Sequence, residues 1–161
     1  MSAPRTPLTD KTPWALVFLL GSLTAMGPLA VDMYLPSLPS ISADMHASPA
    51  AVSATLAAFF AGLGIGQFFY GPLSDRVGRR GPLIVGMAMF IAGAVGCALA
   101  PSVEWLVAAR FLQAIGGSAG QVVARASVRD RFHHQMAARV LSLLMLVIGL
   151  APIIAPIFGG Y

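Results

Sequence analysis

Gly71-Pro72-Leu73-Ser74-Asp75-Arg76-Val77-Gly78-Arg79-Arg80-Gly81-Pro82 is a charged turn that separates two long apolar runs. The stretch contains four charged residues, three glycines and two prolines. Lipid can satisfy neither these charges nor a non-helical backbone, so the turn must lie at a membrane surface. It therefore predicts two membrane-spanning segments that are joined by a short polar connection.

The composition supports the same interpretation. Of the 161 residues, 57% are apolar and 10% are charged, whereas a soluble domain carries about 25% charged residues. The apolar blocks each supply the ~20 residues that cross a ~30 Å hydrocarbon layer. We expect an all-α membrane protein with five transmembrane helices, at residues 14–34, 51–73, 83–100, 103–127 and 140–160. The first run exceeds the core of a signal peptide, so it is predicted to be a retained helix.

Lys and Arg concentrate in alternate connections, and residues 35–50 and 101–102 contain neither. Because these residues accumulate on the cytoplasmic side, we expect a multi-pass membrane protein with a cytoplasmic N-terminus. This sidedness explains the net charge of +4, and no nucleic-acid partner is expected. A belt of interfacial aromatic residues is predicted at Trp14, Tyr34, Tyr70, Trp105 and Tyr161.

Glycines at small-residue spacing predict close helix packing. They are Gly62, Gly64 and Gly66 in the second predicted helix, and Gly116 and Gly120 in the fourth. Two prolines, Pro36 and Pro39, are expected to hold the first outer loop extended. Cys97 is the only cysteine, which excludes an internal disulfide and a cysteine-based metal site. We expect no metal and no cofactor, and we place His46, His133 and His134 on the surface.

Two charges inside the apolar runs, Asp32 and Arg110, are the strongest candidates for function. Their predicted depths in the membrane differ by only ~7 Å along the helix axes. Buried ions usually face a cavity or a partner, so we predict that both belong to a proton- and substrate-responsive site. Two simpler alternatives remain at this stage: Asp32 is solvated at the outer interface, and Arg110 is a purely structural tie.

The fourth predicted helix carries a polar stripe within an arc of ~120°. It consists of Arg110, Gln113, Gly117, Gln121 and Arg125. Lipid would not favour this stripe, so we expect it to line a polar cavity or a helix interface. On the first predicted helix, small residues share a face with Asp32 and leave room for a bound solute.

These segments resemble four motifs of the major facilitator superfamily. Residues 71–80 resemble its Gly-x-Leu-x-Asp-Arg-x-Gly-Arg-Arg signature, and residues 110–120 resemble its fourth-helix motif. Residues 32–39 resemble the end of the first helix in drug/proton antiporters of the Bcr/CflA (bicyclomycin and chloramphenicol resistance) type. Residues 155–160 resemble the fifth-helix antiporter motif, with Ala155 in place of its usual first glycine.

The resemblance implies roles for individual residues. A cytoplasmic gate would comprise Gly71, Asp75, Arg79 and Asp130, with Asp130 paired to Arg79. Substrate binding and proton coupling would involve Asp32, Arg110 and Gln113. A helix bend that limits leak would involve Pro156, Gly159 and Gly160. A fixed, solvated turn that only sets the membrane orientation is the alternative for the gate.

Family members have about twelve helices in two similar halves, whereas five are predicted here. We therefore expect residues 1–161 to be a partial N-terminal transmembrane bundle, the incomplete N-terminal half of a major facilitator fold. Such a piece should not transport alone, because the second half of the transporter would supply the rest of the cavity wall.

The resemblance implies a proton-coupled multidrug efflux transporter, an antiporter of the bacterial inner (plasma) membrane. Its partners would be a small amphipathic drug, protons, the lipid bilayer and the missing second half. The alternatives are a solute/proton symporter of the same superfamily and a non-transporting, truncated membrane protein. No enzyme is expected, because the sequence contains no His-Glu-x-x-His, and its Gly-x-Ser-x-Gly match at residues 116–120 lies within a predicted transmembrane helix instead of a strand-to-helix turn.

Overall fold

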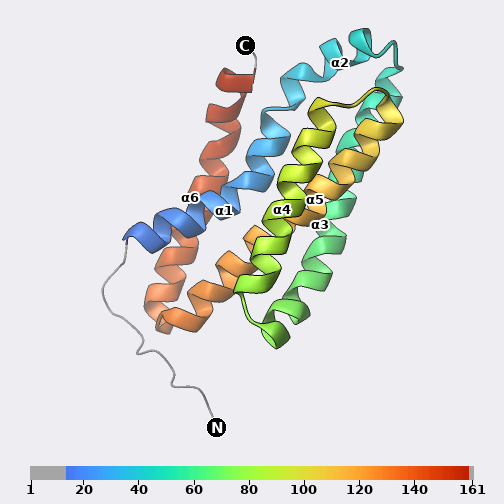
Figure 1. The fold of residues 1–161 in the computed structure, drawn as a ribbon. Helices are drawn as coiled ribbons and strands as arrows, with labels where there is room; N and C mark the ends of the chain where they lie inside the picture. The colour runs from blue at the N-terminus through green and yellow to red at the C-terminus, as the bar shows by residue number, and fades with distance from the viewer. Residues whose placement is uncertain (1–13, 160–161) are drawn as a thin grey trace.

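The computed structural model describes the backbone of residues 14–159 and the side chains of residues 14–150. Within these ranges the chain forms helices and no β-strand (Figure 1), which confirms the all-α class. The elements are α1 (Trp14–Asp32), the short 3-10 helix η1 (Leu35–Ser37), α2 (Leu38–Asp44), α3 (Pro49–Val77), α4 (Arg80–Ala98), α5 (Val103–Arg131) and α6 (His134–Gly159).

Three helical segments of the described chain are long and apolar enough to cross a membrane. They are Trp14–Asp44, Pro49–Val77 and Arg80–Ala98. Helix α5 is less apolar because it carries the polar stripe, and it is also the helix with the most buried residues. The chain is therefore a multi-pass bundle in which the polar helix is shielded by its apolar neighbours.

Helix α5 forms the centre of the bundle, and α1, α3 and α4 all pack against it. Helix α6 lies mainly along α1 (Figure 1), and it also contacts α5. By contrast, α3 and α4 touch each other little although both lie on α5. An apolar cluster that includes Leu20, Val128 and Leu144 joins α1, α5 and α6.

Glycines permit the close approach of α3 and α4 to α5. A Cβ atom on Gly62 would lie 2.6 Å from the carbonyl oxygen of Phe111, and one on Gly93 would lie 2.5 Å from the backbone nitrogen of Gln113. The predicted packing role is therefore confirmed at Gly62, and equally at Gly66, Gly116 and Gly120. It is wrong for Gly64, where a Cβ atom would meet nothing within 4 Å.

Helix α3 extends beyond both of its predicted ends, whereas α1 and α4 end two residues before theirs. Helix α3 begins after Ser48, whose Oγ accepts a hydrogen bond from the Ala51 backbone nitrogen at 3.2 Å. It continues past the predicted end at residue 73 to Val77, because a helix that leaves the membrane can carry charged residues. The following residue, Gly78, has a φ of 88°, a left-handed conformation that glycine adopts without steric cost.

The outer loop is helical, which contradicts the predicted extended conformation. Pro36 and Pro39 lie in the first turns of η1 and α2, respectively. Proline is tolerated there because the first helical N–H groups have no intrahelical acceptor, and its fixed φ suits a helix. The two prolines therefore begin short helices instead of holding the chain extended.

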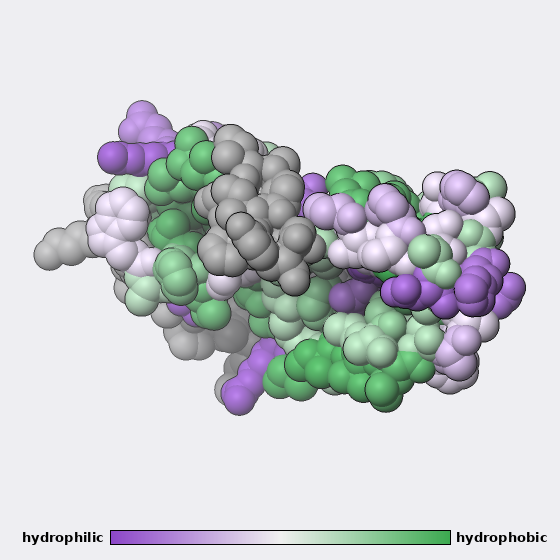
Figure 2. All heavy atoms as spheres, turned by 90° about the horizontal axis from the view of Figure 1, so that it is seen from above, coloured by the Kyte–Doolittle hydropathy of each residue, from purple (hydrophilic) through white to green (hydrophobic). Residues whose placement is uncertain are grey.

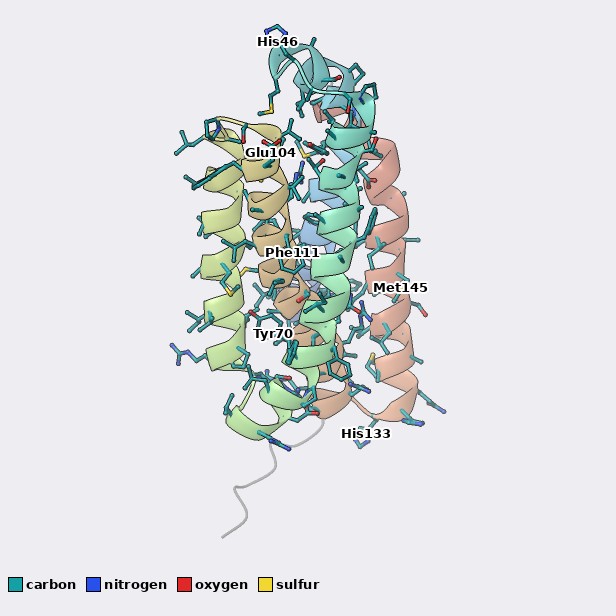
Figure 3. The ribbon with its side chains drawn as sticks, turned by 90° about the vertical axis from the view of Figure 1, so that its right-hand side faces the viewer. His46, Tyr70, Glu104, Phe111, His133 and Met145 are labelled. Carbon is teal, nitrogen blue, oxygen red and sulfur yellow. The ribbon has the colours of Figure 1, made fainter. Side chains whose placement is uncertain are left out.

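The interfacial aromatic belt is only partly present. Trp14 and Trp105 are exposed, as predicted, but Tyr34 and Tyr70 are buried and Tyr161 lies outside the described residues. Tyr34 and Tyr70 turn inward because their hydroxyl groups find partners, Thr55 and Met89, inside the bundle. The predicted surface positions of the histidines are confirmed, with His46 and His133 at opposite ends of the bundle (Figure 3).

Candidate functional site

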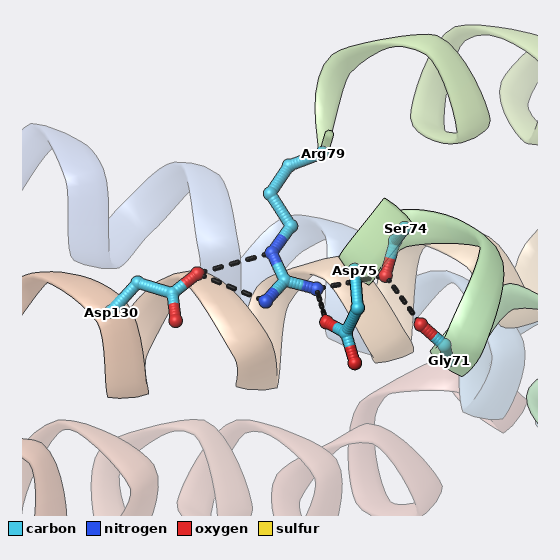
Figure 4. Close-up of polar contacts among 5 residues, drawn as sticks. All are labelled: Gly71, Ser74, Asp75, Arg79 and Asp130. Atoms are coloured by element: carbon cyan, nitrogen blue, oxygen red, sulfur yellow. Dashed lines mark hydrogen bonds and ion pairs between the residues drawn. The ribbon is translucent and has the colours of Figure 1, made fainter. Parts of the chain in front are cut away.

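Arg79 ties the turn between α3 and α4 to the end of α5 (Figure 4). Its Nη1 atom lies 2.6 Å from Asp75 Oδ1 and donates to Ser74 Oγ at 2.8 Å. On its other side, Nε and Nη2 lie 3.1 and 3.0 Å from Asp130 Oδ2. One guanidinium thus bridges two carboxylates on two helices, and the predicted pair of Arg79 and Asp130 is present.

This cluster lies at the surface of the bundle. The side chain of Arg79 is 28% exposed, while those of Asp75 and Asp130 are 66% and 55% exposed. Exposed ion pairs contribute only ~0–1 kcal/mol each. Contacts of this strength can form and break without unfolding the helices that carry them.

Ser74 belongs to the cluster, and sequence reasoning missed it. Its side chain is buried, and its Oγ atom donates to the carbonyl oxygen of Gly71 at 3.0 Å while it accepts from Arg79. Gly71 therefore takes part through its backbone. A Cβ atom at Gly71 would meet nothing within 4 Å, so nothing in this conformation explains a glycine there.

Arg110 lies inside the bundle with only 6% of its surface exposed. Its Nη1 atom donates to the carbonyl oxygen of Ala30 at 3.0 Å and to Gln113 Oε1 at 3.3 Å. Its Nε atom is buried and has no hydrogen-bond partner. Among the described side chains, no carboxylate lies within ion-pair distance of Arg110.

The aromatic ring of Tyr34 replaces a carboxylate beside Arg110. The guanidinium carbon lies 3.5 Å from the Tyr34 ring centroid and 5.6 Å from that of Phe59. The Tyr34 hydroxyl is 2.8 Å from Thr55 Oγ1, and Thr55 in turn donates to the Val52 carbonyl oxygen. Sequence reasoning placed Tyr34 at the lipid interface, although its position two residues after Asp32 could have indicated the site.

A pocket of about 240 Å³ lies beside this arginine. Its lining includes Arg110, Gln113, Tyr34 and Cys97, with the Cys97 Sγ atom 3.8 Å from Gln113 Oε1. Seen from above, Figure 2 shows hydrophilic atoms in a recess between hydrophobic surfaces. The polar stripe of α5 thus reaches an open pocket at its outer end.

Asp32 lies at the end of α1, close to this pocket in the sequence but not paired with Arg110. It is half-buried, and its Oδ2 atom is buried without a hydrogen-bond partner. Arg110 instead binds the carbonyl oxygen of Ala30, two residues earlier on the same helix. In this conformation a buried donor, Arg110 Nε, and a buried acceptor, Asp32 Oδ2, are both unsatisfied.

The inner part of the polar stripe is also buried. Gln121 Oε1 accepts from Arg125 Nη2 at 3.0 Å and from Gln67 Nε2 at 3.4 Å. Between the two polar clusters, the side chain of Phe90 packs against Gly117. The stripe therefore forms helix interfaces for most of its length, with an apolar break in the middle.

The family model described as the Major Facilitator Superfamily matches residues 16–161. The chain belongs to the major facilitator superfamily. Its helices and charged turn are accordingly those of a transporter family.

Curated members of this superfamily include several similar proteins. The chain is 48% identical to an uncharacterized MFS-type transporter, YdgK, of Bacillus subtilis and 38% identical to a bicyclomycin resistance protein homolog of Haemophilus influenzae, each over 94% of its length. It is 34% identical over 90% of its length to multidrug resistance protein D of Escherichia coli. It spans 38%, 38% and 37% of the lengths of these three relatives, respectively.

The structure brings together some predicted residues of this major facilitator chain and leaves others apart. Arg79, Asp75 and Asp130 form one cluster, and Arg110 and Gln113 form another. Pro156 and Gly159 lie in the backbone of α6, but their surroundings and Gly160 fall outside the described residues. Tyr34, Thr55 and Ser74 are the contacts that the sequence motifs alone did not reveal.

Proposed function

We propose that this chain is the N-terminal bundle of a proton-coupled efflux transporter that exports small amphipathic drugs across the bacterial inner membrane. The names of two relatives, a bicyclomycin resistance homolog and multidrug resistance protein D, support drugs as the substrates. The arginine distribution supports a cytoplasmic N-terminus. Lipid surrounds the bundle, and a second half of the transporter completes the cavity.

The buried, carboxylate-free environment of Arg110 carries this proposal. A buried cation that is held only by a carbonyl, an amide and an aromatic ring is costly in a membrane and marks a functional site. Asp32 is the nearby group that can change its charge. When Asp32 loses its proton it attracts the guanidinium, and when it gains one it releases the guanidinium to Ala30, Gln113 and Tyr34.

The cluster around Arg79 supplies the second part of the mechanism. It joins α3, the start of α4 and the end of α5 by exposed contacts that are individually weak. Breaking them allows these helix ends to separate, which opens the cytoplasmic side during alternating access. By the resemblance to the fifth-helix antiporter motif, Pro156, Gly159 and Gly160 would limit leak.

The test uses the complete coding frame that contains these residues. The transporter moves a fluorescent drug into everted membrane vesicles. The rate of drug accumulation is measured while the imposed pH gradient is varied. Asp32→Asn should remove the pH dependence, and Arg110→Ala should abolish accumulation. The control is Arg139→Gln, which removes an exposed charge from α6. It should leave both drug accumulation and its pH dependence unchanged.

Two outcomes contradict the proposal. If the unmodified protein accumulates no drug in response to a pH gradient, the transporter assignment fails. If it does so but both variants retain unchanged pH-dependent transport, Asp32 and Arg110 have no part in the coupling.

A further inference from the structure

An apolar groove runs between α3 and α4 on the side of the bundle away from α1 and α6. Its volume is about 510 Å³, within the ~300–1,000 Å³ of typical ligand pockets. The α3 wall includes Ile65, Phe69, Leu73 and Val77, each four residues after the last, and Val85 belongs to the α4 wall. The groove exists because both helices pack on α5 but scarcely on each other.

The groove has the exposure and length of a site for a lipid chain. Two of its apolar side chains are largely exposed, Phe69 at 65% and Val85 at 56%. In a transmembrane bundle, an exposed apolar surface of this kind contacts either lipid or another part of the protein. From Ile65 to Val77, the α3 wall measures ~18 Å at 1.5 Å per residue. This length is close to the ~15 Å hydrocarbon depth of one membrane leaflet.

A positive charge lies at one end of this groove. Arg76 is exposed and makes no ion pair within the described part of the chain, whereas neighbouring Arg79 is occupied by Asp75 and Asp130. At ~100° per residue, Arg76 falls inside the ~140° arc of α3 that lines the groove. The charge is therefore on the groove face and is free for a ligand.

We propose that the groove between α3 and α4 binds an acyl chain of an anionic phospholipid and that Arg76 binds its phosphate group. The polar end of this apolar channel carries two exposed cations that make no ion pair in the described part of the chain, Arg76 and also Arg80, which precedes the groove-lining Gly81. Such a channel is complementary to an anionic lipid. Basic pockets between transmembrane helices are known to select anionic headgroups. The proposal does not depend on drug export, because the groove shares no lining residue with the pocket beside Arg110.

Two substitutions separate the contributions of charge and groove. Arg76→Gln removes the cation, and Arg139→Gln is its control because it removes an exposed charge from α6. Gly81→Leu fills the mouth of the groove, where an added Cβ atom meets nothing within 4 Å. Gly64→Leu is its control, since a Cβ atom there is equally unopposed but Gly64 does not line the groove.

The measurement is native mass spectrometry of the complete protein, purified without lipid and titrated with phosphatidylglycerol or phosphatidylcholine. Arg76→Gln should weaken retention of phosphatidylglycerol about fivefold, the effect of one surface cation on an anionic lipid, and leave phosphatidylcholine unchanged. Gly81→Leu should lower retention of both lipids. Both control variants should match the unmodified protein, and thermal unfolding verifies that all variants fold.

Three results would overturn the proposal. Equal phosphatidylglycerol retention by Arg76→Gln and Arg139→Gln removes the phosphate site. Equal retention by Gly81→Leu and Gly64→Leu removes the groove as the binding surface. Absence of any retained lipid from the unmodified protein means that another part of the complete protein fills the groove.

Discussion

The guanidinium carbon of Arg110 lies 3.5 Å from the ring centroid of Tyr34. The Tyr34 hydroxyl contacts Thr55 on α3 at 2.8 Å, so one aromatic residue after α1 connects α5 to α3. A cation over an aromatic face is stabilised by ~0.5–2 kcal/mol, more when the pair is desolvated. The ring therefore offsets part of the cost of a buried arginine that lacks a carboxylate.

Tyr34→Leu should impair the transporter more than Tyr34→Phe. Leucine removes the aromatic face beside Arg110, whereas phenylalanine keeps it and loses only the hydrogen bond to Thr55. We expect a transport rate about tenfold lower for Tyr34→Leu, equivalent to ~1.4 kcal/mol of lost cation–π stabilisation, measured as drug accumulation in vesicles. Tyr70→Leu is the control, because Tyr70 is also buried but contacts Met89 and no arginine. Equal rates for Tyr34→Leu and Tyr34→Phe would show that the ring is unimportant.

Gly62→Ala should destabilise the bundle, while Gly64→Ala should not. The new Cβ atom at position 62 would lie 2.6 Å from a backbone oxygen of α5, which cannot move aside as a side chain can. Overpacking of this kind costs ~1–3 kcal/mol. At position 64 the Cβ atom is unopposed, and alanine favours the helix by ~1 kcal/mol. Thermal unfolding in detergent measures the stability of the two variants. A lower stability for Gly64→Ala than for Gly62→Ala would contradict the packing geometry.

Arg79→Gln should alter the conformational equilibrium with little effect on stability. The contacts of Arg79 are partly exposed, so their loss should cost no more than ~1 kcal/mol of unfolding free energy. The separation of α3 and α5 near Asp130 should nevertheless increase, as measured by spin-label distances. Exchanging the charges, with Arg79→Asp and Asp130→Arg together, should restore part of the short distance. An unchanged distance distribution in Arg79→Gln would show that this contact does not hold the two helices together.

Gly78→Ala should destabilise the α3–α4 turn. Its φ of 88° and ψ of 166° define a backbone conformation that is essentially restricted to glycine, and a residue with a Cβ atom there costs ~1–3 kcal/mol. Gly71→Ala has no such strain and no steric conflict in this conformation, so it should unfold at a temperature no lower than that of the unmodified protein. If transport fails in Gly71→Ala although stability is unchanged, the glycine is needed in another conformation of the cycle.

Much of the fold could be predicted from local chemistry. Apolar block lengths predicted the five long helices, and three helical segments of the described chain are long and apolar enough to span a membrane. Helix ends were less predictable, because α3 and α5 continue as helices through exposed, charged residues that the sequence pattern assigned to the connections. The outer loop was mispredicted because a proline that stops one helix can also begin the next.

By itself, the sequence determined the all-α class, the family and the two sets of charges, because hydropathy and motif spacing are properties of the chain alone. Only the tertiary structure decided which groups those charges meet. It placed Tyr34, Ala30 and Gln113 around Arg110 instead of Asp32, and it added Ser74 to the Arg79 cluster. The reason is physical: hydrogen-bond partners depend on ångström-scale helix separations, which here follow from glycines on one helix that pack against the backbone of another.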